Sequence, residues 1–387
     1  MIPYGKQDIS QQDIDAVVDV LKSDFLTQGP KVPVFESALT SHTGAKYAVA
    51  VNSATSALHI ACMALELGEG DWLWTSPITF VASANAGLYC GAKVDFVDID
   101  SRTYNICPNK LEKKLEIASL DGRLPKVLVP VHLCGQPCDM KRIRELCNKY
   151  NVKIVEDASH AIGGSYQGEL IGSCKYSDIT VFSFHPVKIV TTAEGGAGLT
   201  NDHKLAQKMT LYRSHGITRD QGEMNEVSHG AWYYQQITLG YNYRMTELQA
   251  ALGISQMMRL TDFVATRHKI AECYNFLLKD LPVQIPYQLK NTYSGLHLYV
   301  IRLQLDAISA THKEVFEELR SNQIAVNLHY IPVHIHPYYR AMGFRYGDFP
   351  VSEEYYKEAI SLPMYPGLSE EDQKLVVQVL AAAIMAK

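Results

Sequence analysis

Hydrophobic residues in the first half of the chain occur in short, almost uniformly apolar runs. The runs are KYAVAVN (46–52), DWLWTS (71–76), KVDFVDI (93–99), KVLVPVH (126–132), KIVEDA (153–158) and ITVFSF (179–184). A strand that does not alternate between apolar and polar residues is buried on both faces, as in a parallel sheet covered by helices. The pattern therefore predicts an α/β fold with a mainly parallel sheet.

Helical periodicity fills the stretches between these runs. Ile14, Val17, Val18 and Leu21 recur at helical spacing after Ser10, which predicts a capped helix over about 10–21. Further helices are predicted over TSALHIACMALEL (55–67), ITFVASANAGLY (78–89) and DMKRIRELCNKYN (139–151).

The pattern changes after residue 200. Residues 201–245 are rich in polar and aromatic side chains, and a long helical stretch is predicted from about 245 to 278. Then follow a strand in LHLYVIRLQL (296–305), a helix in THKEVFEELR (311–320) and a terminal helix over 369–386. We expect a large α/β domain over residues 1–245 and a smaller C-terminal α+β domain over residues 246–387.

Composition narrows the possible partners. The 387 residues carry a formal net charge of −5, so no basic field attracts nucleic acid or an anionic membrane. Two charge-free runs, 47–65 and 73–92, contain amides, hydroxyls and a proline that do not suit a membrane interior. The first residues lack the pattern of a signal peptide, so we expect a cytoplasmic protein.

Cysteines and histidines do not predict a metal site. The eight cysteines occur singly, without a C-x-x-C pair, and we interpret them as free thiols. His334 and His336, in HYIPVHIHPYY (329–339), could share one strand face as metal ligands. No acid or cysteine accompanies them in that stretch, so we predict no metal.

Polar residues that could carry chemistry lie where predicted strands end, which is where ligands bind in open α/β sheets. NSATSA (52–57) follows one strand and opens a helix, so its free N–H groups and the hydroxyls of Thr55 and Ser56 could bind a phosphate. The alternative is a plain helix cap. In EDASH (156–160), Asp157 could hold a protonated ring nitrogen of a bound heterocycle, or cap a helix.

Lys188 is surrounded by small and hydroxyl-bearing residues in SFHPVKIVTTAEGGAG (183–198). A shielded lysine has a lowered pKa and can act as a Schiff-base nucleophile and proton carrier. A phosphate cradle, a buried acid and a desolvated lysine are together what a pyridoxal 5′-phosphate site needs. Phe80 could stack on the cofactor ring, although a role as a helix residue in the core is equally compatible with its pattern.

In these motifs the chain resembles the DegT/DnrJ/EryC1/StrS family of sugar aminotransferases, a branch of the fold type I pyridoxal phosphate enzymes. The resemblance covers nearly the whole chain and implies a seven-stranded, mainly parallel sheet. The matching stretches are DFLTQGP (24–30), NSATSALH (52–59), SPITFVASANAGLYCGAKVDFVDID (76–100), VHLCGQPCDM (131–140), EDASHAIGG (156–164), SFHPVKIVTTAEGG (183–196), YRSHGITRD (212–220) and GYNYRMTELQAALGISQ (240–256).

The resemblance implies roles for particular residues. Lys188 would hold the cofactor covalently and Asp157 would hold its ring nitrogen, which makes these two the catalytic residues. The implied cofactor-binding set is Ala54, Thr55, Ser56, Phe80, Asp157, His160, Ser183, Lys188 and Asn242. Asn242 would reach the phosphate of the partner subunit, which implies a homodimer with shared sites. His160 departs from the glutamine that many members carry.

Substrate residues are also implied by the resemblance. Tyr4, Leu26, Thr27, Gln28, Gly29, Tyr330 and Ile331 would line the sugar-nucleotide pocket. Arg213 and Arg219 are candidates for the diphosphate, with surface ion pairs as the alternative. EDASH, HPVKIVTT and AWYY are most similar to members that aminate C4 of a UDP-linked 4-keto-6-deoxy-N-acetylhexosamine, with L-glutamate as donor, in pseudaminic acid biosynthesis.

Three alternatives stay open. The chain could aminate another nucleotide keto sugar, at C3 or C4 and with dTDP or UDP. A family dehydratase has histidine in place of the lysine, and Lys188 argues against it. A non-catalytic sensor of the same fold is disfavoured by the intact lysine, aspartate and phosphate cradle.

Overall fold

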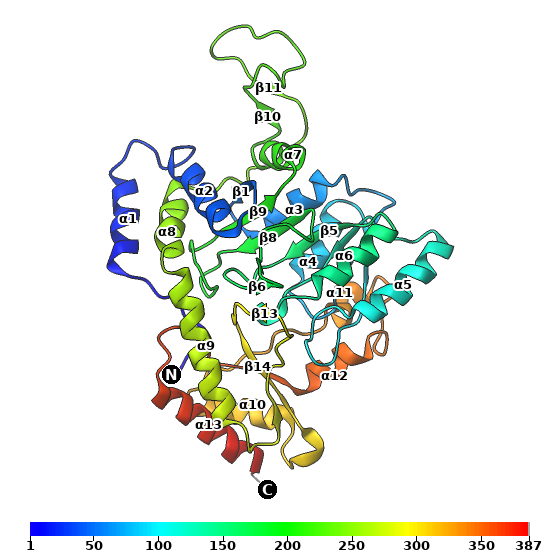
Figure 1. The fold of residues 1–387 in the computed structure, drawn as a ribbon, viewed down its shortest axis with the longest axis vertical. Helices are drawn as coiled ribbons and strands as arrows, with labels where there is room; N and C mark the ends of the chain where they lie inside the picture. The colour runs from blue at the N-terminus through cyan, green and yellow to red at the C-terminus, as the bar shows by residue number, and fades with distance from the viewer. Residues whose placement is uncertain (386–387) are drawn as a thin grey trace.

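The structure, a computed structural model, describes residues 1–385 and is built around a seven-stranded sheet (Figure 1). The strand order is β1-β9-β8-β5-β4-β2-β3. β9 is antiparallel to both neighbours, and the other strands share one direction. The predicted mainly parallel sheet is confirmed. Its strands are β1 (Tyr47–Val51), β2 (Trp72–Thr75), β3 (Lys93–Phe96), β4 (Val127–Val129), β5 (Lys153–Asp157), β8 (Ile179–Ser183) and β9 (Gly196–Thr200).

Each face of the sheet packs against its own set of helices. Leu73 and Val155 belong to a core with α3, α4 and α7, whereas Trp74 and Ile154 belong to a core with α2, α5, α6 and α8. Because both faces are buried, the strands carry apolar residues at nearly every position. The helices are α2 (Lys31–Thr43), α3 (Ala54–Ala64), α4 (Ala82–Tyr89), α5 (Pro108–Asp121), α6 (Met140–Lys149), α7 (His203–Arg213) and α8 (Glu247–Met257).

The C-terminal part has a separate core at the end of the molecule where both chain termini lie (Figure 1). An antiparallel sheet of β12 (Val283–Gln284), β14 (Tyr299–Leu303) and β15 (Ala359–Leu362) packs there against α9 (Leu260–Leu277), α10 (His312–Ser321) and α13 (Glu370–Met385). Ile2 forms a bridge beside Ile324, so the first residues lie with this part. The domain boundary at residue 245 stays a prediction.

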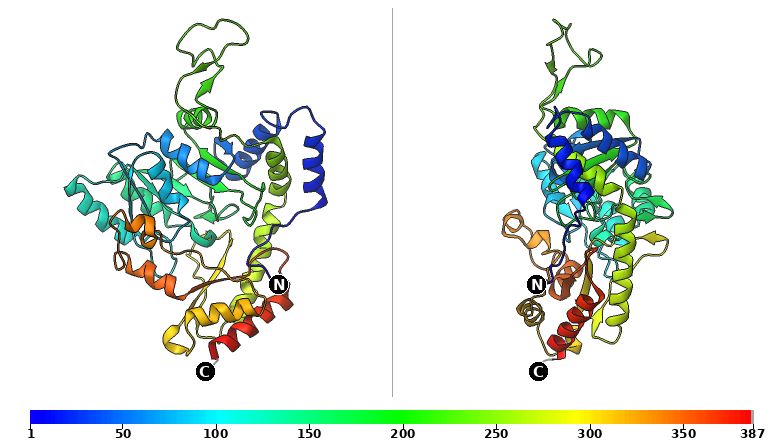
Figure 2. Two further views of the ribbon diagram at one scale, coloured as in Figure 1. Left: turned by 180° about the vertical axis from the view of Figure 1, so that it is seen from behind. Right: turned by 90° about the vertical axis from the view of Figure 1, so that its left-hand side faces the viewer.

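Smaller elements complete the fold. β10 (Ile217–Thr218) and β11 (Gln235–Gln236) form a hairpin whose loop projects far from the rest of the molecule (Figure 2). The others are α1 (Gln11–Leu21), α11 (Pro337–Arg340), α12 (Pro350–Glu358), β6 (Ser165–Tyr166), β7 (Glu169–Leu170), β13 (Thr292–Tyr293) and the 3-10 turns η1 (Leu133–Gly135), η2 (Leu305–Ala307) and η3 (Val333–Ile335).

Two helix predictions were wrong in their bounds. The stretch 245–278 is two helices, α8 and α9, which separate at Arg259, where the guanidinium is paired with Asp8 and with Asp13 of α1. The helix predicted from residue 78 begins only at Ala82, so Phe80 is not a helix residue. Its side chain is 58% exposed, which also excludes the core role.

Two further predictions agree with the structure. The predicted cap of the first helix is present, since Ser10 Oγ accepts the Asp13 N–H and Asp13 accepts the Ser10 N–H in return. The terminal helix is α13, and its predicted end at residue 386 lies outside the described residues. Among residues 1–385, none of the helices is long and apolar enough to span a membrane.

Candidate active site

A cavity of about 410 Å³ opens at the carboxyl ends of β5 and β8. It is bounded by the start of α3, the segment before α4, the loop after β8, and residues 297 and 329–330 of the C-terminal part. Nine of the predicted site residues line it together: Tyr4, Ala54, Thr55, Phe80, Asp157, His160, Ser183, Lys188 and Tyr330.

Lys188 lies in the loop after β8, and its side-chain amine forms no hydrogen bond or ion pair within residues 1–385. Burial removes water from the ammonium and lowers its pKa to about 8, against the smaller opposing effect of Asp157. At neutral pH a fraction of the amine is therefore uncharged and nucleophilic. The lowered lysine pKa expected from the sequence is present.

Asp157 is the last residue of β5 and is only 5% exposed. Its Oδ2 accepts a hydrogen bond of 2.6 Å from Ser83 Oγ, and its Oδ1 accepts from Ser159 N (3.2 Å) and Ser159 Oγ (2.6 Å). Ser83 in turn lies 2.7 Å from Thr79 Oγ1. Donors to both oxygens fix the orientation of the carboxyl group in the cavity wall.

The start of α3 combines a helix cap with an open anion site. Ser53 Oγ caps the helix by accepting the Ser56 N–H, and Ser56 Oγ donates to Asn52 Oδ1. The backbone N–H groups of Ala54 and Thr55 have no partner within residues 1–385. The helix-cap alternative is therefore present in Ser53 and Ser56, and the Ser56 hydroxyl is not free for a phosphate as predicted. Ala54 and Thr55 line the cavity with unpaired N–H donors, and their role at a phosphate stays a prediction.

A glycine brings Ser183 beside this helix start. Gly196 of β9 pairs with Val51 of β1 on one side and with Ser183 of β8 on the other. A Cβ on Gly196 would lie 2.5 Å from Ala54 N, so only glycine allows β9 to pass under the helix. Ser183 of β8 and the N–H groups of Ala54 and Thr55 at the start of α3 consequently line the same cavity.

Histidines and aromatic side chains close the cavity on the side of the C-terminal part. Phe80 and Tyr330 have ring centroids 6.1 Å apart, and His160 and His297 are 4.5 Å apart. Burial, together with Lys188, lowers the pKa of His297 well below its usual range and that of His329 to about 3. These imidazoles are therefore neutral. Among the described residues that line the cavity, positive charge is supplied by Lys188.

Sequence reasoning missed several lining residues. They are Ser53, Thr79, Ser159, His185, Glu194, His297 and His329. Ser159 and His185 lie within the quoted motifs EDASH and SFHPVK, and His297 is a polar residue between Leu296 and Leu298 in a predicted strand, which were the available signals. Its Nδ1 is buried without a partner among the described residues.

Other predicted residues lie outside the cavity. Leu26 O accepts the Glu247 N–H and Thr27 pairs with Thr246, which places residues 26–29, including Gln28 and Gly29, at the start of α8. Asn242 is exposed beside Ser214, and Ile331 is 42% exposed. None of these residues lines the cavity of its own chain, nor does Ser56.

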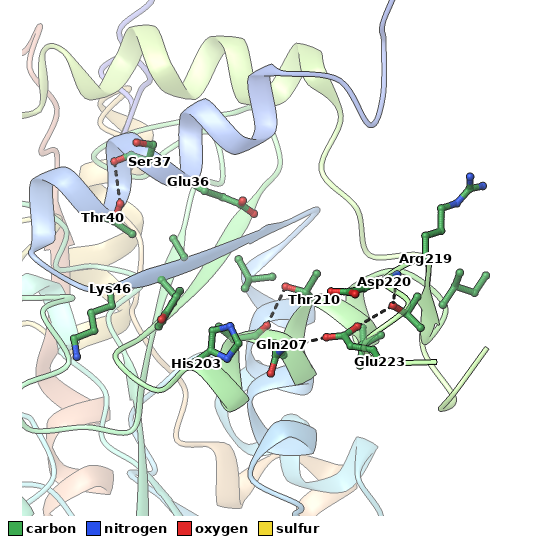
Figure 3. Close-up of a pocket in the computed structure, with 17 residues that line it drawn as sticks. Glu36, Ser37, Thr40, Lys46, His203, Gln207, Thr210, Arg219, Asp220 and Glu223 are labelled. Atoms are coloured by element: carbon green, nitrogen blue, oxygen red, sulfur yellow. Dashed lines mark hydrogen bonds between the residues drawn. The ribbon is translucent and has the colours of Figure 1, made fainter. Parts of the chain in front are cut away.

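The two arginines predicted for the diphosphate lie elsewhere as well. Arg213 Nη1 is paired with Glu36 Oε1 at 2.6 Å and donates to Ala50 O at 2.8 Å, which is the ion-pair alternative. Arg219 lines a separate, open cavity of about 600 Å³ between α2, β1 and α7 (Figure 3). Its guanidinium lies 5.7 Å from the ring centre of Tyr234.

Of the two candidate metal ligands, His334 and His336, the first has an acidic neighbour that the sequence did not reveal. His334 Nε2 is 3.0 Å from Glu353 Oε1, so an acid does accompany it, contributed by α12. Within residues 1–385, no group of three or more histidine, cysteine, aspartate or glutamate side chains is arranged to hold a metal ion.

The cavity fits pyridoxal 5′-phosphate. The free N–H groups of Ala54 and Thr55 and the Ser183 hydroxyl suit the phosphate. Asp157 suits a protonated ring nitrogen, and the unpaired amine of Lys188 suits the aldehyde. The exposed ring of Phe80 lines the same cavity and suits stacking on the face of the pyridine ring.

Known proteins that are similar to this chain include aminotransferases and a protein of polysaccharide biosynthesis. The model of the DegT/DnrJ/EryC1/StrS aminotransferase family matches residues 7–381. The spore coat polysaccharide biosynthesis protein SpsC of Bacillus subtilis is 39% identical, over 97% of this chain and 95% of that protein. A UDP-4-amino-4,6-dideoxy-N-acetyl-beta-L-altrosamine transaminase of Campylobacter jejuni is 38% identical, over 98% of this chain and 96% of that protein.

Solved structures of this kind share the whole fold. PseC of Helicobacter pylori, an aminotransferase involved in the biosynthesis of pseudoaminic acid, has a TM-score of 0.90 at 32% identity over 99% of both chains. A sugar aminotransferase of Streptococcus pneumoniae, Spr1654, whose structures include a PLP-form, has a TM-score of 0.89 at 29% identity, over 99% of this chain and 98% of that one. The chain belongs to the DegT/DnrJ/EryC1/StrS aminotransferase family and is a sugar aminotransferase that uses pyridoxal 5′-phosphate.

Proposed function

We propose that this enzyme transfers the amino group of L-glutamate to C4 of a UDP-linked 4-keto-6-deoxy-N-acetylhexosamine, in the cytoplasm, as a step toward pseudaminic acid. The observation that carries the proposal is the 38% identity, over 98% of the chain, to a protein named for that transamination. The desolvated Lys188 and the buried Asp157 at one cavity support the transaminase chemistry.

Two residues carry the proton chemistry in this proposal. Pyridoxal phosphate, when bound, supplies an electron sink for the carbanion of transamination. Asp157, oriented by Ser83 and Ser159, keeps the ring nitrogen protonated. Lys188 Nζ takes the proton from the α-carbon of glutamate and delivers one to C4 of the sugar, which a lowered pKa allows near neutral pH.

The remaining residues bind and orient. Ala54, Thr55 and Ser183 hold the phosphate, and Phe80 covers the ring. Tyr4 and Tyr330 contact the sugar from the side of the C-terminal part. The exposed position of Asn242 supports a homodimer in which it serves the partner's phosphate, and the loop 26–29 with Ile331 stays a prediction for substrate contact.

A panel of nucleotide keto sugars tests the function. Purified enzyme is incubated with L-glutamate and UDP- or dTDP-linked 3-keto and 4-keto sugars, and the amino sugars are identified by mass spectrometry. We expect turnover of the UDP-4-keto-6-deoxy-N-acetylhexosamine and none by Lys188→Ala. Preference for another sugar would support the alternative suggested by 39% identity to the spore coat polysaccharide protein.

A further inference from the structure

We propose that His160 is a positioning residue for the sugar: it donates a hydrogen bond to Tyr330 Oη and thereby turns the Tyr330 hydroxyl proton toward an uncharged oxygen of the keto sugar. The inference rests on the proposed sugar aminotransferase function and adds a residue that orients the acceptor. It depends on the two hydrogen bonds that the ring nitrogens of His160 form.

The first contact fixes the tautomer of His160. The backbone N–H of Cys134 donates to His160 Nδ1 at 3.2 Å. An imidazole nitrogen that accepts a hydrogen bond cannot carry a proton, so the proton of the neutral ring is on Nε2. The turn that carries Cys134 is held close, because a Cβ on the next residue, Gly135, would lie 2.7 Å from the backbone oxygen of His160.

The ring stays neutral for a second reason. Lys188, His329 and His297 surround the ring, the last with its ring centre 4.5 Å away, and the Asp157 carboxylate of the same cavity is bonded by Ser83 and Ser159 and not by His160. Burial and the nearby ammonium lower the pKa of His160 well below its usual range. A charged imidazole that served as general acid would need a carboxylate in this position.

The second contact sets the direction of the Tyr330 hydroxyl. His160 Nε2 lies 3.2 Å from Tyr330 Oη, and because Nε2 carries the proton, Tyr330 is the acceptor. The phenolic proton is then left for another group, and Tyr330 Oη has no second partner within residues 1–385. Tyr330 lines the cavity that contains Lys188, so the free proton is available to a ligand there.

The Tyr330 backbone is held independently. The preceding residue, His329, accepts a hydrogen bond of 2.7 Å at its backbone oxygen from Tyr355 Oη, and its Nδ1 is 2.8 Å from Ser361 Oγ. Burial raises the pKa of Tyr330, so the hydroxyl keeps its proton. A neutral, directed donor can hydrogen-bond a carbonyl or hydroxyl oxygen of a sugar, whereas the unpaired backbone N–H groups of Ala54 and Thr55 at the start of α3 suit an anion.

Three variants test the relay, meaning the hydrogen bonds from Cys134 N–H to His160 and from His160 to Tyr330 Oη. In His160→Gln the side-chain oxygen can accept the Cys134 N–H and the amide nitrogen can donate to Tyr330, so both contacts are kept. His160→Leu removes both contacts, and Tyr330→Phe removes the final donor. The rates of the two half-reactions are measured separately in single turnovers: glutamate with the resting enzyme, and keto sugar with the amine-loaded enzyme.

We expect His160→Leu and Tyr330→Phe to slow the sugar half-reaction, or to weaken sugar binding, by roughly 3- to 10-fold, the effect of one hydrogen bond. The double variant should be no worse than either single variant. The glutamate half-reaction should lose less than the sugar half-reaction in His160→Leu and Tyr330→Phe, and His160→Gln should resemble the wild type in both. Equal loss in His160→Gln and His160→Leu, or an additive double variant, would overturn the inference.

A readout without turnover separates this inference from the proposed function. In protein labelled with ¹⁵N-histidine, the His160 nitrogens are assigned by their loss in His160→Gln, and their chemical shifts report the tautomer. We expect a neutral ring with its proton on Nε2 from pH 6 to 8. A charged ring or a proton on Nδ1 would overturn the relay, whereas failure to use the UDP sugar would overturn only the substrate assignment, and the half-reactions would be measured with the sugar that is accepted.

Discussion

Glu156 and Asp157 are consecutive residues of β5, and their carboxylates lie on opposite sides of the sheet. Glu156 Oε2 is 2.8 Å from His132 Nε2, and Glu156 Oε1 accepts from Thr180. Asp157 instead bonds Ser83 at the wall of the cavity. Successive residues of a strand point to opposite faces, so β5 delivers only one of its two acids to the site.

This arrangement predicts different outcomes for the two acids. Asp157→Asn keeps the shape but cannot hold a ring nitrogen protonated, so kcat should fall about 100-fold or more, with cofactor binding less affected. Glu156→Gln can still accept the His132 proton and should stay within a few-fold of the wild type. Steady-state kinetics and cofactor content check both. Near-normal turnover of Asp157→Asn would show that another acid has the role.

The lowered pKa of Lys188 predicts how cofactor uptake depends on pH. Only the neutral amine reacts with the aldehyde; with a pKa of about 8, roughly a tenth is neutral at pH 7, and most is neutral at pH 9. The uptake rate of the apoenzyme, followed by absorbance, should rise from pH 7 to 9 with a midpoint near 8 and level off above. Since Asp157 raises the Lys188 pKa, Asp157→Asn should shift the midpoint below 8. A midpoint near 10 would mean that the amine is not desolvated.

Arg213 should matter for stability and not for substrate binding. Its pairing with Glu36 and Ala50 joins α7 to α2 and β1. Arg213→Gln should lower the free energy of unfolding by about 2 kcal/mol, measured by urea denaturation, with KM for the sugar nucleotide unchanged. Arg219→Gln is the matched control and should leave stability unchanged. A raised KM in Arg213→Gln at wild-type stability would restore the diphosphate role.

The shared-site proposal is tested with two inactive variants, Lys188→Ala and Asn242→Ala. If Asn242 serves the partner's phosphate, a hybrid dimer has one site with both changes and one site with neither. Activity should therefore return after subunit exchange, toward about half of the wild-type value per hybrid dimer. Asn242→Ala must first be shown to be badly impaired alone. Demonstrated exchange without recovery would place Asn242 in its own chain's site.

Several features of the protein could be predicted from local sequence. The uniformly apolar runs indicated burial on both faces of a sheet, and the polar residues at the end of KIVEDA and after ITVFSF marked where Asp157 and Lys188 stand. Neighbours along the chain determine these properties, because strand burial and helix starts depend on residues a few positions apart.

Other features were decided only by tertiary packing. Arg213 pairs with Glu36, which is 177 positions away in the sequence, and Tyr330 contacts His160, which is 170 positions away. Local sequence patterns therefore do not predict either contact. The cavity side that carries His297 and His329 comes from the C-terminal part, and the two helices α8 and α9 separate where Arg259 meets Asp8 and Asp13. Periodicity reports which side of an element is buried, whereas the identity of the partner depends on which distant segment packs there.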